Sequence, residues 1–243
     1  MLHVPPLPGS PRCRQPLDAI EEFVIYEASV LADAGIDGMM LENFGDTPFY
    51  PHRVPPHTVA CMAVLAREVK RRFALPLGVN VLRNDGVSAL AVAAAAEADF
   101  IRVNVYTGAR VADQGLLEGE AHQIQRDRQL LGSKVEVWAD VAVKHSAALG
   151  ERSLAEEVED ALRRGLANAI IVSGAATGKP TSLDHVREVK AAAGEAPVLV
   201  GSGVTAATIR AALDAADGVI VGTSFKHGGV VSKDRVRELL AAR

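Results

Sequence analysis

The feature that most constrains the fold of this chain is a regular alternation of short apolar runs and longer amphipathic segments. The short runs are apolar almost throughout rather than at every second position, as in parallel strands that are buried on both faces. Seven such runs predict strands at residues 36–41, 77–81, 100–105, 135–141, 169–172, 198–200 and 218–221. Helical periodicity predicts eight helices at residues 17–34, 57–73, 86–98, 120–131, 153–164, 182–193, 205–215 and 232–242.

This order of elements predicts an α/β fold, a (β/α)8 TIM barrel. Such a barrel takes about 250 residues, so one domain uses all of residues 1–243. An open doubly wound sheet is the alternative, and the lack of a dinucleotide-binding fingerprint counts against it. Good N-cap residues open several helices, namely Ser153, Ser182, Thr205 and Ser232, and glycines stand at C-cap positions 35, 132 and 165.

The barrel is predicted to have a short or incomplete first strand. Only residues 1–4 are available for it, and they span about 13 Å at most. Pro5 and Pro6 cannot donate to a strand ladder and therefore end it. Residues missing upstream are the favoured explanation; a stub closed by water and an intermolecular contact are the alternatives.

Composition excludes several functional classes. Hydrophobic residues make up 49% of the chain and charged residues 23%, and the net charge of -4 argues against a nucleic-acid partner. Cys13 and Cys61 have neither metal-ligand spacing nor a disulfide framework, which favours two thiols in a reducing cytoplasm. No apolar run reaches the length of a transmembrane segment, and the first residues lack the pattern of a signal peptide, so we expect a cytoplasmic protein.

Six motifs together resemble the BtpA/SgcQ family. They are PPLPGSP at 5–11, LENFGD at 41–46, GVNVLRND at 78–85, FIRVNV at 100–105, ADVAVKHS at 139–146 and GTSFK at 222–226. The resemblance implies a barrel of the ribulose-phosphate-binding type. It also implies a link either to sugar metabolism, as in the SgcQ proteins, or to photosystem I biogenesis with peripheral membrane association, as described for the founding member. Members of the family usually have a full apolar strand before the first motif.

Four residues are candidates for acid–base or nucleophilic chemistry, because they follow predicted strands, where a barrel builds its active site. They are Glu42, Asp140, Lys144 and His145. Lys144 could form a Schiff base if its pKa were depressed, although a solvated lysine is the more ordinary interpretation. Glu42, Asp140 and His145 are residue types that could hold a divalent metal. The sequence has no metal-ligand motif, however, so no metal site is assigned and the cofactor stays unknown.

Further polar residues at strand ends are predicted to bind the ligand, since burying polar groups without partners is costly. They are Asn43, Asn80, Arg102, Asn104, Ser173 and Thr177. We expect Glu42, Asn80, Asn104, Asp140 and Lys144 to point into one cavity. The alternative is a polar barrel layer in which Asn80, Asn104 and Asp140 merely satisfy one another.

Two glycine-containing loops predict a phosphate site, because barrels of this kind often bind phosphate after strands seven and eight and at a helix N-terminus. The residues are Gly201, Ser202, Gly203, Gly222, Thr223, Ser224 and Lys226. Glycines let backbone amides approach an anion, and the serines and the lysine add donors. The alternative is that the glycines serve only tight turns.

These features favour an enzyme acting on a small phosphorylated sugar or nucleoside-like compound, as an isomerase, lyase or hydrolase. The alternative is a non-catalytic assembly or stability factor for photosystem I or another membrane complex. An enzyme should have a convergent polar pocket, and a scaffold an exposed apolar patch. Long loops at residues 49–56 and 106–119 are predicted to be lids or oligomer contacts, and we expect a homo-oligomer.

Overall fold

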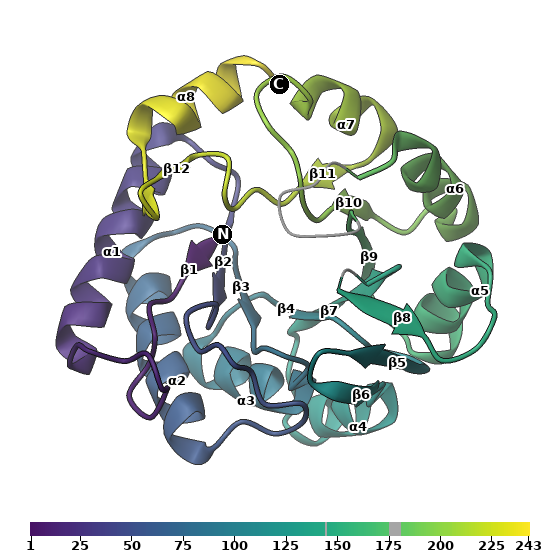
Figure 1. Ribbon diagram of the computed structural model, residues 1–243, viewed down its shortest axis with the longest axis horizontal. Helices are drawn as coiled ribbons and strands as arrows, with labels where there is room; N and C mark the ends of the chain where they lie inside the picture. The colour runs from purple at the N-terminus through teal and green to yellow at the C-terminus, as the bar shows by residue number, and fades with distance from the viewer. Residues whose placement is uncertain (144, 175–180) are drawn as a thin grey trace. The chain divides into compact units, whose positions relative to one another are not determined.

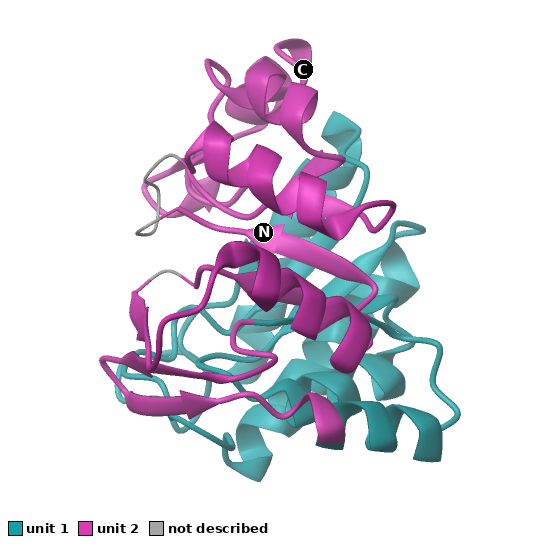
Figure 2. Cartoon of the chain, turned by 90° about the vertical axis from the view of Figure 1, so that its right-hand side faces the viewer, with its two compact units in different colours: residues 1–103, 123–136 teal, residues 104–122, 137–243 magenta. Residues whose placement is uncertain are grey.

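The computed structural model describes residues 1–143, 145–174 and 181–243. The chain divides into two compact units, residues 1–103 with 123–136 and residues 104–122 with 137–243, coloured teal and magenta in Figure 2. Each unit is built from parallel strands followed by helices, as the alternating sequence pattern predicts. The assignment of residues 1–243 to a single domain stays a prediction.

The first unit contains four parallel strands in the order in which they occur in the chain. They are β1 (Leu2–His3), β2 (Met39–Glu42), β3 (Leu77–Asn80) and β4 (Phe100–Val103) (Figure 1). The helices of this unit are α1 (Leu17–Ala34), α2 (Pro56–Arg72), α3 (Gly86–Ala96) and most of α4 (Ala121–Leu130). Leu41, Val79 and Ile101 on the strands are fully buried, because helices cover the apolar sheet.

The first strand is short, as predicted. Leu2 and His3 of β1 are paired with Leu41 and Glu42 of β2. The Val4 amide donates to the Glu42 carbonyl at 2.8 Å, and the Gly45 amide donates to the Val4 carbonyl at 3.0 Å. Proline at positions 5 and 6 then removes the next donors of the ladder.

The second unit contains the parallel strands β7 (Glu136–Val141, all but its first residue), β9 (Ala169–Val172), β10 (Val198–Val200) and β11 (Gly218–Val219), adjacent in this order. Its helices are α5 (Leu154–Glu159), which continues as the π-helical turn η1 (Asp160–Arg164), α6 (Leu183–Ala193), α7 (Ile209–Ala215) and α8 (Lys233–Ala241). The carboxyl ends of parallel strands meet at one edge of a sheet, so the loops that follow β7, β9, β10 and β11 share that edge.

The predicted helix starts are only partly correct. Ser153 forms a complete capping box with Glu156 at the start of α5. Ser182 and Ser232 occupy N-cap positions without a side-chain hydrogen bond to the helix. The start predicted at Thr205 is wrong, because residues 206–208 form a turn first and α7 begins at Ile209.

The segment at residues 106–119, predicted to be a long loop, contains strands. This segment contains the hairpin of β5 (Ala109–Ala112) and β6 (Gly115–Glu118), and β5 also pairs with β8 (Ser146–Ala148). Only Leu117 of the hairpin strands is buried, so the periodicity that identifies a strand is weak. A second hairpin, β12 (Lys226–His227) and β13 (Val230–Val231), places Lys226 on a strand before α8.

The same three-residue contact stabilises the amino-terminal ends of neighbouring strands in both units. In the first unit, Asp99 accepts hydrogen bonds from Lys70 Nζ at 2.6 Å and from the Leu77 amide at 2.7 Å. In the second unit, Asp217 accepts them from Lys190 Nζ at 2.6 Å and from the Val198 amide at 2.8 Å. Each aspartate directly precedes one strand and binds the first residue of the adjacent strand. In a barrel, residues at the amino-terminal ends of the strands typically stabilise the fold, whereas the active site lies at the carboxyl ends.

Replacement of Asp217 by alanine is expected to destabilise the fold modestly. The hydrogen bond from Lys190 is the main reason that the pKa of Asp217 is lowered. Ionised Asp217 therefore stabilises the folded state at pH values above the ordinary aspartate pKa, and this stabilisation is lost as pH falls through the lowered pKa. Because the side chain is partly exposed, we expect a loss of about 1 kcal/mol at neutral pH, or about 2–4 °C in Tm. Thermal unfolding of Asp217→Ala and of the exposed helix control Asp214→Ala from acidic to neutral pH tests this; equal stability of Asp217→Ala and the parent at neutral pH would contradict it.

Candidate functional site

Polar residues at the strand ends of the first unit are held by one another. Asn80 Nδ2 donates to Glu42 Oε2 at 2.6 Å, and both side chains are buried. His3 Nε2 lies 3.8 Å from Glu42 Oε1, and the imidazole stacks on Phe44 with 4.4 Å between ring centroids. The sequence analysis missed His3, because only the register of β1 against β2 places it opposite Glu42.

Asn43, predicted to bind ligand, holds neighbouring segments of the chain together in the structure. Its Oδ1 accepts from the Leu82 amide at 2.7 Å, and its Nδ2 donates to Asp46 Oδ2 at 3.1 Å. Asp46 Oδ1 accepts from the Leu7 amide at 2.8 Å, which fastens the proline-rich segment to the loop after β2. Burial raises the pKa of Asp46, although these hydrogen bonds oppose the shift.

Asp85, at the end of the third motif, is also structural. Its carboxylate is fully buried and accepts from the Val54 amide at 2.8 Å and the Ser88 amide at 2.9 Å, the latter as the N-cap of α3. Arg53 Nη1 lies 3.3 Å from Asp85 Oδ1. These contacts attach the predicted lid segment at residues 49–56 to the start of α3. Arg102, a predicted ligand residue, is buried on β4 in the same unit.

The second unit contains a polar pair at the end of β7. Asn104 Nδ2 donates to Asp140 Oδ2 at 2.5 Å, and the two side chains are buried. Asn104 Oδ1, in contrast, is buried and has no hydrogen-bond partner among the described residues. A buried acceptor without a partner costs about 1–3 kcal/mol, so such an atom in a pocket wall indicates a place for a ligand donor.

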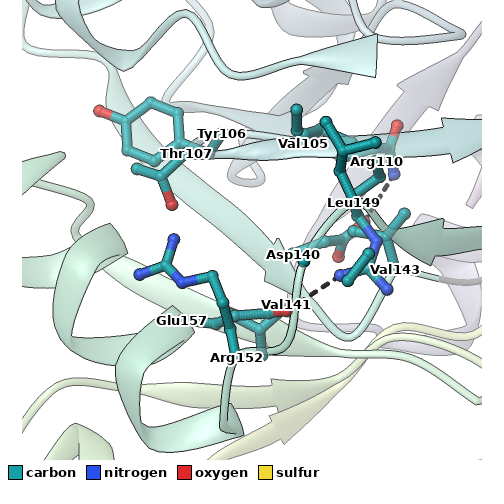
Figure 3. A pocket seen from close by; sticks show the side chains of 14 residues that line it. Val105, Tyr106, Thr107, Arg110, Asp140, Val141, Val143, Leu149, Arg152 and Glu157 are labelled. Carbon is teal, nitrogen blue, oxygen red and sulfur yellow. Dashed lines mark hydrogen bonds and ion pairs between the residues drawn. The ribbon is translucent and has the colours of Figure 1, made fainter. Parts of the chain in front are cut away.

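A pocket of about 310 Å³ lies against this pair (Figure 3). Its wall is formed by the segment after β4, the end of β7, the β5–β8 side of the small sheet and α5. The lining residues are Asn104, Val105, Tyr106, Thr107, Ala109, Arg110, Asp140, Val141, Val143, Ala148, Leu149, Gly150, Arg152 and Glu157. It is at the lower end of the size range of ligand sites, which suits a small molecule.

The charged groups in this pocket are paired. Arg110 Nη1 donates to Glu157 Oε1 at 3.0 Å, and Arg110 Nε donates to Ser146 Oγ at 2.8 Å. Glu157 Oε2 accepts from the Ala142 amide at 3.1 Å, so Glu157 connects α5 with both β5 and the end of β7. Arg152 donates to Asp160, a bond that raises the pKa of Arg152 and keeps it cationic.

The two loops predicted to bind phosphate follow β10 and β11 in the second unit. Within the part of the chain that the structure describes, Ser202 Oγ and Ser224 Oγ are buried without a hydrogen-bond partner, and Lys226 is also buried. The Gly201 amide, in contrast, donates to the Val172 carbonyl at 2.7 Å and is thus used by the sheet. Gly203 has a φ of 73°, in the left-handed region, whereas Gly222 is half-buried and Thr223 is exposed.

The remaining predicted site residues are distributed as follows. Ser173 is buried directly after β9, at the same edge of the sheet as Ser202. His145 is exposed and has a φ of 56°. Lys144 and Thr177 lie outside the described residues. Among the residues that are described, no three acidic, histidine or cysteine side chains converge as a metal site.

The prediction that Glu42, Asn80, Asn104, Asp140 and Lys144 line one cavity stays a prediction. The structure pairs Glu42 with Asn80 in one unit and Asn104 with Asp140 in the other. The alternative, in which these residues only satisfy one another, accounts for Asn80 but leaves the acceptor of Asn104 unexplained.

Two solved structures illustrate the similarity of this fold to known enzymes. Thiamine phosphate pyrophosphorylase from Pyrococcus furiosus aligns over 90% of this chain and 88% of its own, with a TM-score of 0.61 and 14% identity. 3-Hexulose-6-phosphate synthase aligns over 91% of this chain and 94% of its own, with a TM-score of 0.57 and 17% identity. At these identities the likeness concerns the fold alone, and it confirms the predicted TIM barrel.

The sequence relationship is much closer. Photosystem I biogenesis protein BtpA of Synechocystis is 44% identical over 96% of this chain and 81% of that protein. The family model described as the BtpA family matches residues 1–243. The chain therefore belongs to the BtpA family, as its six motifs predict.

Proposed function

We propose that this protein is an enzyme that binds a small phosphorylated sugar or nucleoside-like compound at the carboxyl ends of the strands of its second unit. The observation that carries the proposal is the pair of buried hydroxyl groups of Ser202 and Ser224, which find no hydrogen-bond partner in residues 1–143, 145–174 and 181–243. They belong to the two loops in which barrels of this kind often bind phosphate. A phosphate group accepts hydrogen bonds and would satisfy both hydroxyl groups.

The positive charge for the anion comes from Lys226 in this proposal. Its side chain is buried on β12, and its backbone amide donates to the Thr223 carbonyl at 3.1 Å, which brings β12 next to the loop after β11. Gly203 and Gly222 leave room for the anion near the backbone. The Gly201 amide is excluded as a donor because it already bonds Val172.

The chemical step is assigned to Asp140. Its carboxylate lies in the pocket wall and is held by Asn104 Nδ2, so it is oriented to exchange a proton with a bound ligand. Isomerisation, aldol-type cleavage and glycosidic hydrolysis all need such a group. Two of the structural neighbours carry names of enzymes of phosphorylated compounds, thiamine phosphate and hexulose 6-phosphate, which supports this class.

A non-catalytic biogenesis factor is the second candidate, and the name of the Synechocystis relative favours it. In the described part of the chain, no helix has both the length and the apolar character needed to cross a membrane. Peripheral association with a membrane, a cytoplasmic location and a homo-oligomer remain proposals. The pocket, with Asn104 and Asp140 in its wall, favours the enzyme.

Binding of inorganic phosphate tests the proposed site. We expect millimolar phosphate to raise the Tm of the parent protein, and we expect the double variant Ser202→Ala, Ser224→Ala to lose most of this gain, because two donors to the anion are removed. Each lost hydrogen bond to a charged group is expected to weaken binding by about tenfold. The measurements are thermal shift and isothermal titration calorimetry.

The control is the double variant Ser29→Ala, Ser133→Ala, which removes two hydroxyl groups from the first unit. It should respond to phosphate as the parent does. Equal phosphate binding by the parent and by the Ser202, Ser224 double variant would contradict the site, and absence of phosphate binding by the parent would contradict the proposed function.

A further inference from the structure

The pocket beside Asn104 and Asp140 has a composition that selects the chemistry of its ligand. Two described cations, Arg110 and Arg152, and two anions, Asp140 and Glu157, line it, so their formal charges cancel. Arg110 is bonded to Glu157, and Arg152 to Asp160 outside the lining. A ligand carboxylate at either arginine, or a ligand ammonium group at Glu157, would have to compete with these partly buried pairs. The pocket therefore favours an uncharged polar group.

The unpartnered atom in the pocket wall specifies a donor. Asn104 is 2% exposed, and its Nδ2 already donates to Asp140. The remaining polar atom, Oδ1, is an acceptor, so a ligand group that satisfies it must be a donor. Hydroxyl groups of a ligand donate to such an oxygen and can also accept from a neighbouring donor. A neutral carbon chain bearing hydroxyl groups satisfies both requirements, absence of charge and presence of donors.

The distance to the proposed phosphate loops suits such a ligand. Strands β7, β9 and β10 are adjacent, and neighbouring strands lie about 4.8 Å apart, so the ends of β7 and β10 are separated by about 10 Å. A small phosphate ester can span this distance with a hydrogen bond at each end. In the register of β7 against β9, Asp140 lies opposite Ile171, and the last residues of the two strands, Val141 and Val172, lie opposite each other. Asp140 is therefore one residue before the carboxyl end of β7.

Residues of β5 and β8, two strands of the small sheet, form part of the pocket wall (Figure 3). Arg110 on β5 is bonded to Ser146 on β8 and to Glu157 on α5, and thus fixes the sheet to the helix next to the pocket. Tyr106 is fully buried and donates from its hydroxyl group to the Gly165 carbonyl, which fixes the start of this segment as well. The wall is therefore attached to the unit at both ends.

From these observations we infer that the pocket is a specificity site for the neutral, hydroxyl-bearing part of the ligand, and that Asn104 Oδ1 accepts a hydrogen bond from one of its hydroxyl groups. The inference rests on the proposed function for the phosphate end of the same ligand. It adds the selection of neutral polyols over carboxylated or amino-substituted analogues. Asn104 is here a binding residue that also orients Asp140.

Three hexose-derived phosphates of similar size test the charge selection. Glucose 6-phosphate is neutral at its other end, 6-phosphogluconate carries a carboxylate and glucosamine 6-phosphate an ammonium group. Titration calorimetry on the full chain should give at least tenfold tighter binding of the neutral compound. Ribose 5-phosphate and 2-deoxyribose 5-phosphate then test whether removal of a single hydroxyl group weakens binding.

The variant Asn104→Leu tests the role of the acceptor, since leucine has a similar size and no polar atom. We expect at least tenfold weaker binding of glucose 6-phosphate or ribose 5-phosphate, with no change in binding of inorganic phosphate, because the serine loops are intact. Gln129→Leu, which removes an exposed side-chain amide on α4, is the control and should bind as the parent does. Circular dichroism and Tm establish that both variants are folded; should Asn104→Leu not fold, Asn104→Ala is measured instead.

Equal binding of the sugar phosphates by the parent and the Asn104 variant, or tightest binding of the charged analogue, overturns the inference while leaving the phosphate site intact. If inorganic phosphate does not bind, the proposed function fails, and the pocket is then tested with glucose and ribose themselves. Loss of their binding in Asn104→Leu supports the pocket on its own, and absence of binding to the parent overturns it.

Discussion

Replacement of Asp85 by alanine is expected to lower the free energy of unfolding by about 3 kcal/mol or more, equivalent to roughly 6–12 °C in Tm for a domain of this size. The carboxylate is fully buried and accepts from two backbone amides, those of Val54 and Ser88. Alanine leaves both amides without an acceptor and also removes the N-cap of α3. Each unsatisfied buried donor costs about 1–3 kcal/mol.

Two further variants identify the source of this effect. Asp85→Asn keeps one acceptor oxygen and nearly the same volume, so we expect a smaller loss than with alanine. Asp184→Ala removes an exposed carboxylate paired with Arg187 on α6 and should change Tm very little. Thermal and urea unfolding monitored by circular dichroism give the comparison. A Tm of Asp85→Ala within 2 °C of the parent would be incompatible with the structural role assigned to Asp85.

The strand and helix pattern could be predicted well because buried parallel strands are continuous apolar runs. The bounds of β9 and β10 agree with residues 169–172 and 198–200, and those of α1 with residues 17–34. The hairpin β5–β6 was missed because it is a small, mostly exposed sheet that pairs with β8 from a later part of the chain. Such pairing depends on contacts between distant residues, which a local pattern does not contain.

The site could be predicted only in part, because a motif gives residue types and not their partners. Asn43 and Asp85 belong to motifs at strand ends, as Asn104 and Asp140 do. In the structure the first two are satisfied by backbone amides, whereas Asn104 keeps a free acceptor in a pocket wall. The distinction between a structural and a ligand-binding polar residue is therefore made by hydrogen-bond accounting, which needs coordinates.

The two serines illustrate the opposite case. The spacing of the glycine-containing loops after the seventh and eighth predicted strands was enough to select Ser202 and Ser224. The structure adds that both hydroxyl groups are buried without partners, and that the Gly201 amide is not available. The expected contribution of a helix N-terminus is not supported, since α7 begins only at Ile209, after a turn.

Replacement of Asp140 by asparagine is expected to reduce turnover of a phosphorylated substrate by about 10²–10⁴-fold, the usual contribution of a general acid–base group. Asparagine has the same shape, and its oxygen can still accept from Asn104 Nδ2, which in the parent donates to Asp140 at 2.5 Å. The ligand should therefore bind the variant with nearly unchanged affinity, while the group that exchanges the proton is lost. A decrease in kcat without an increase in KM separates this role from a role in binding.

The measurement is consumption of each sugar phosphate in a panel, followed by phosphorus and proton NMR with the parent, Asp140→Asn and the surface control Asp214→Asn. Turnover by the parent and by the control, together with its loss in Asp140→Asn, would establish the assigned step. Equal turnover by Asp140→Asn would transfer the acid–base role to another group. Buried Glu42, which lies near the half-buried His3 in the first unit, would be examined next by Glu42→Gln. If the parent binds sugar phosphates but converts none of them, a non-catalytic role becomes the better account, because the pocket would then select a ligand without acting on it.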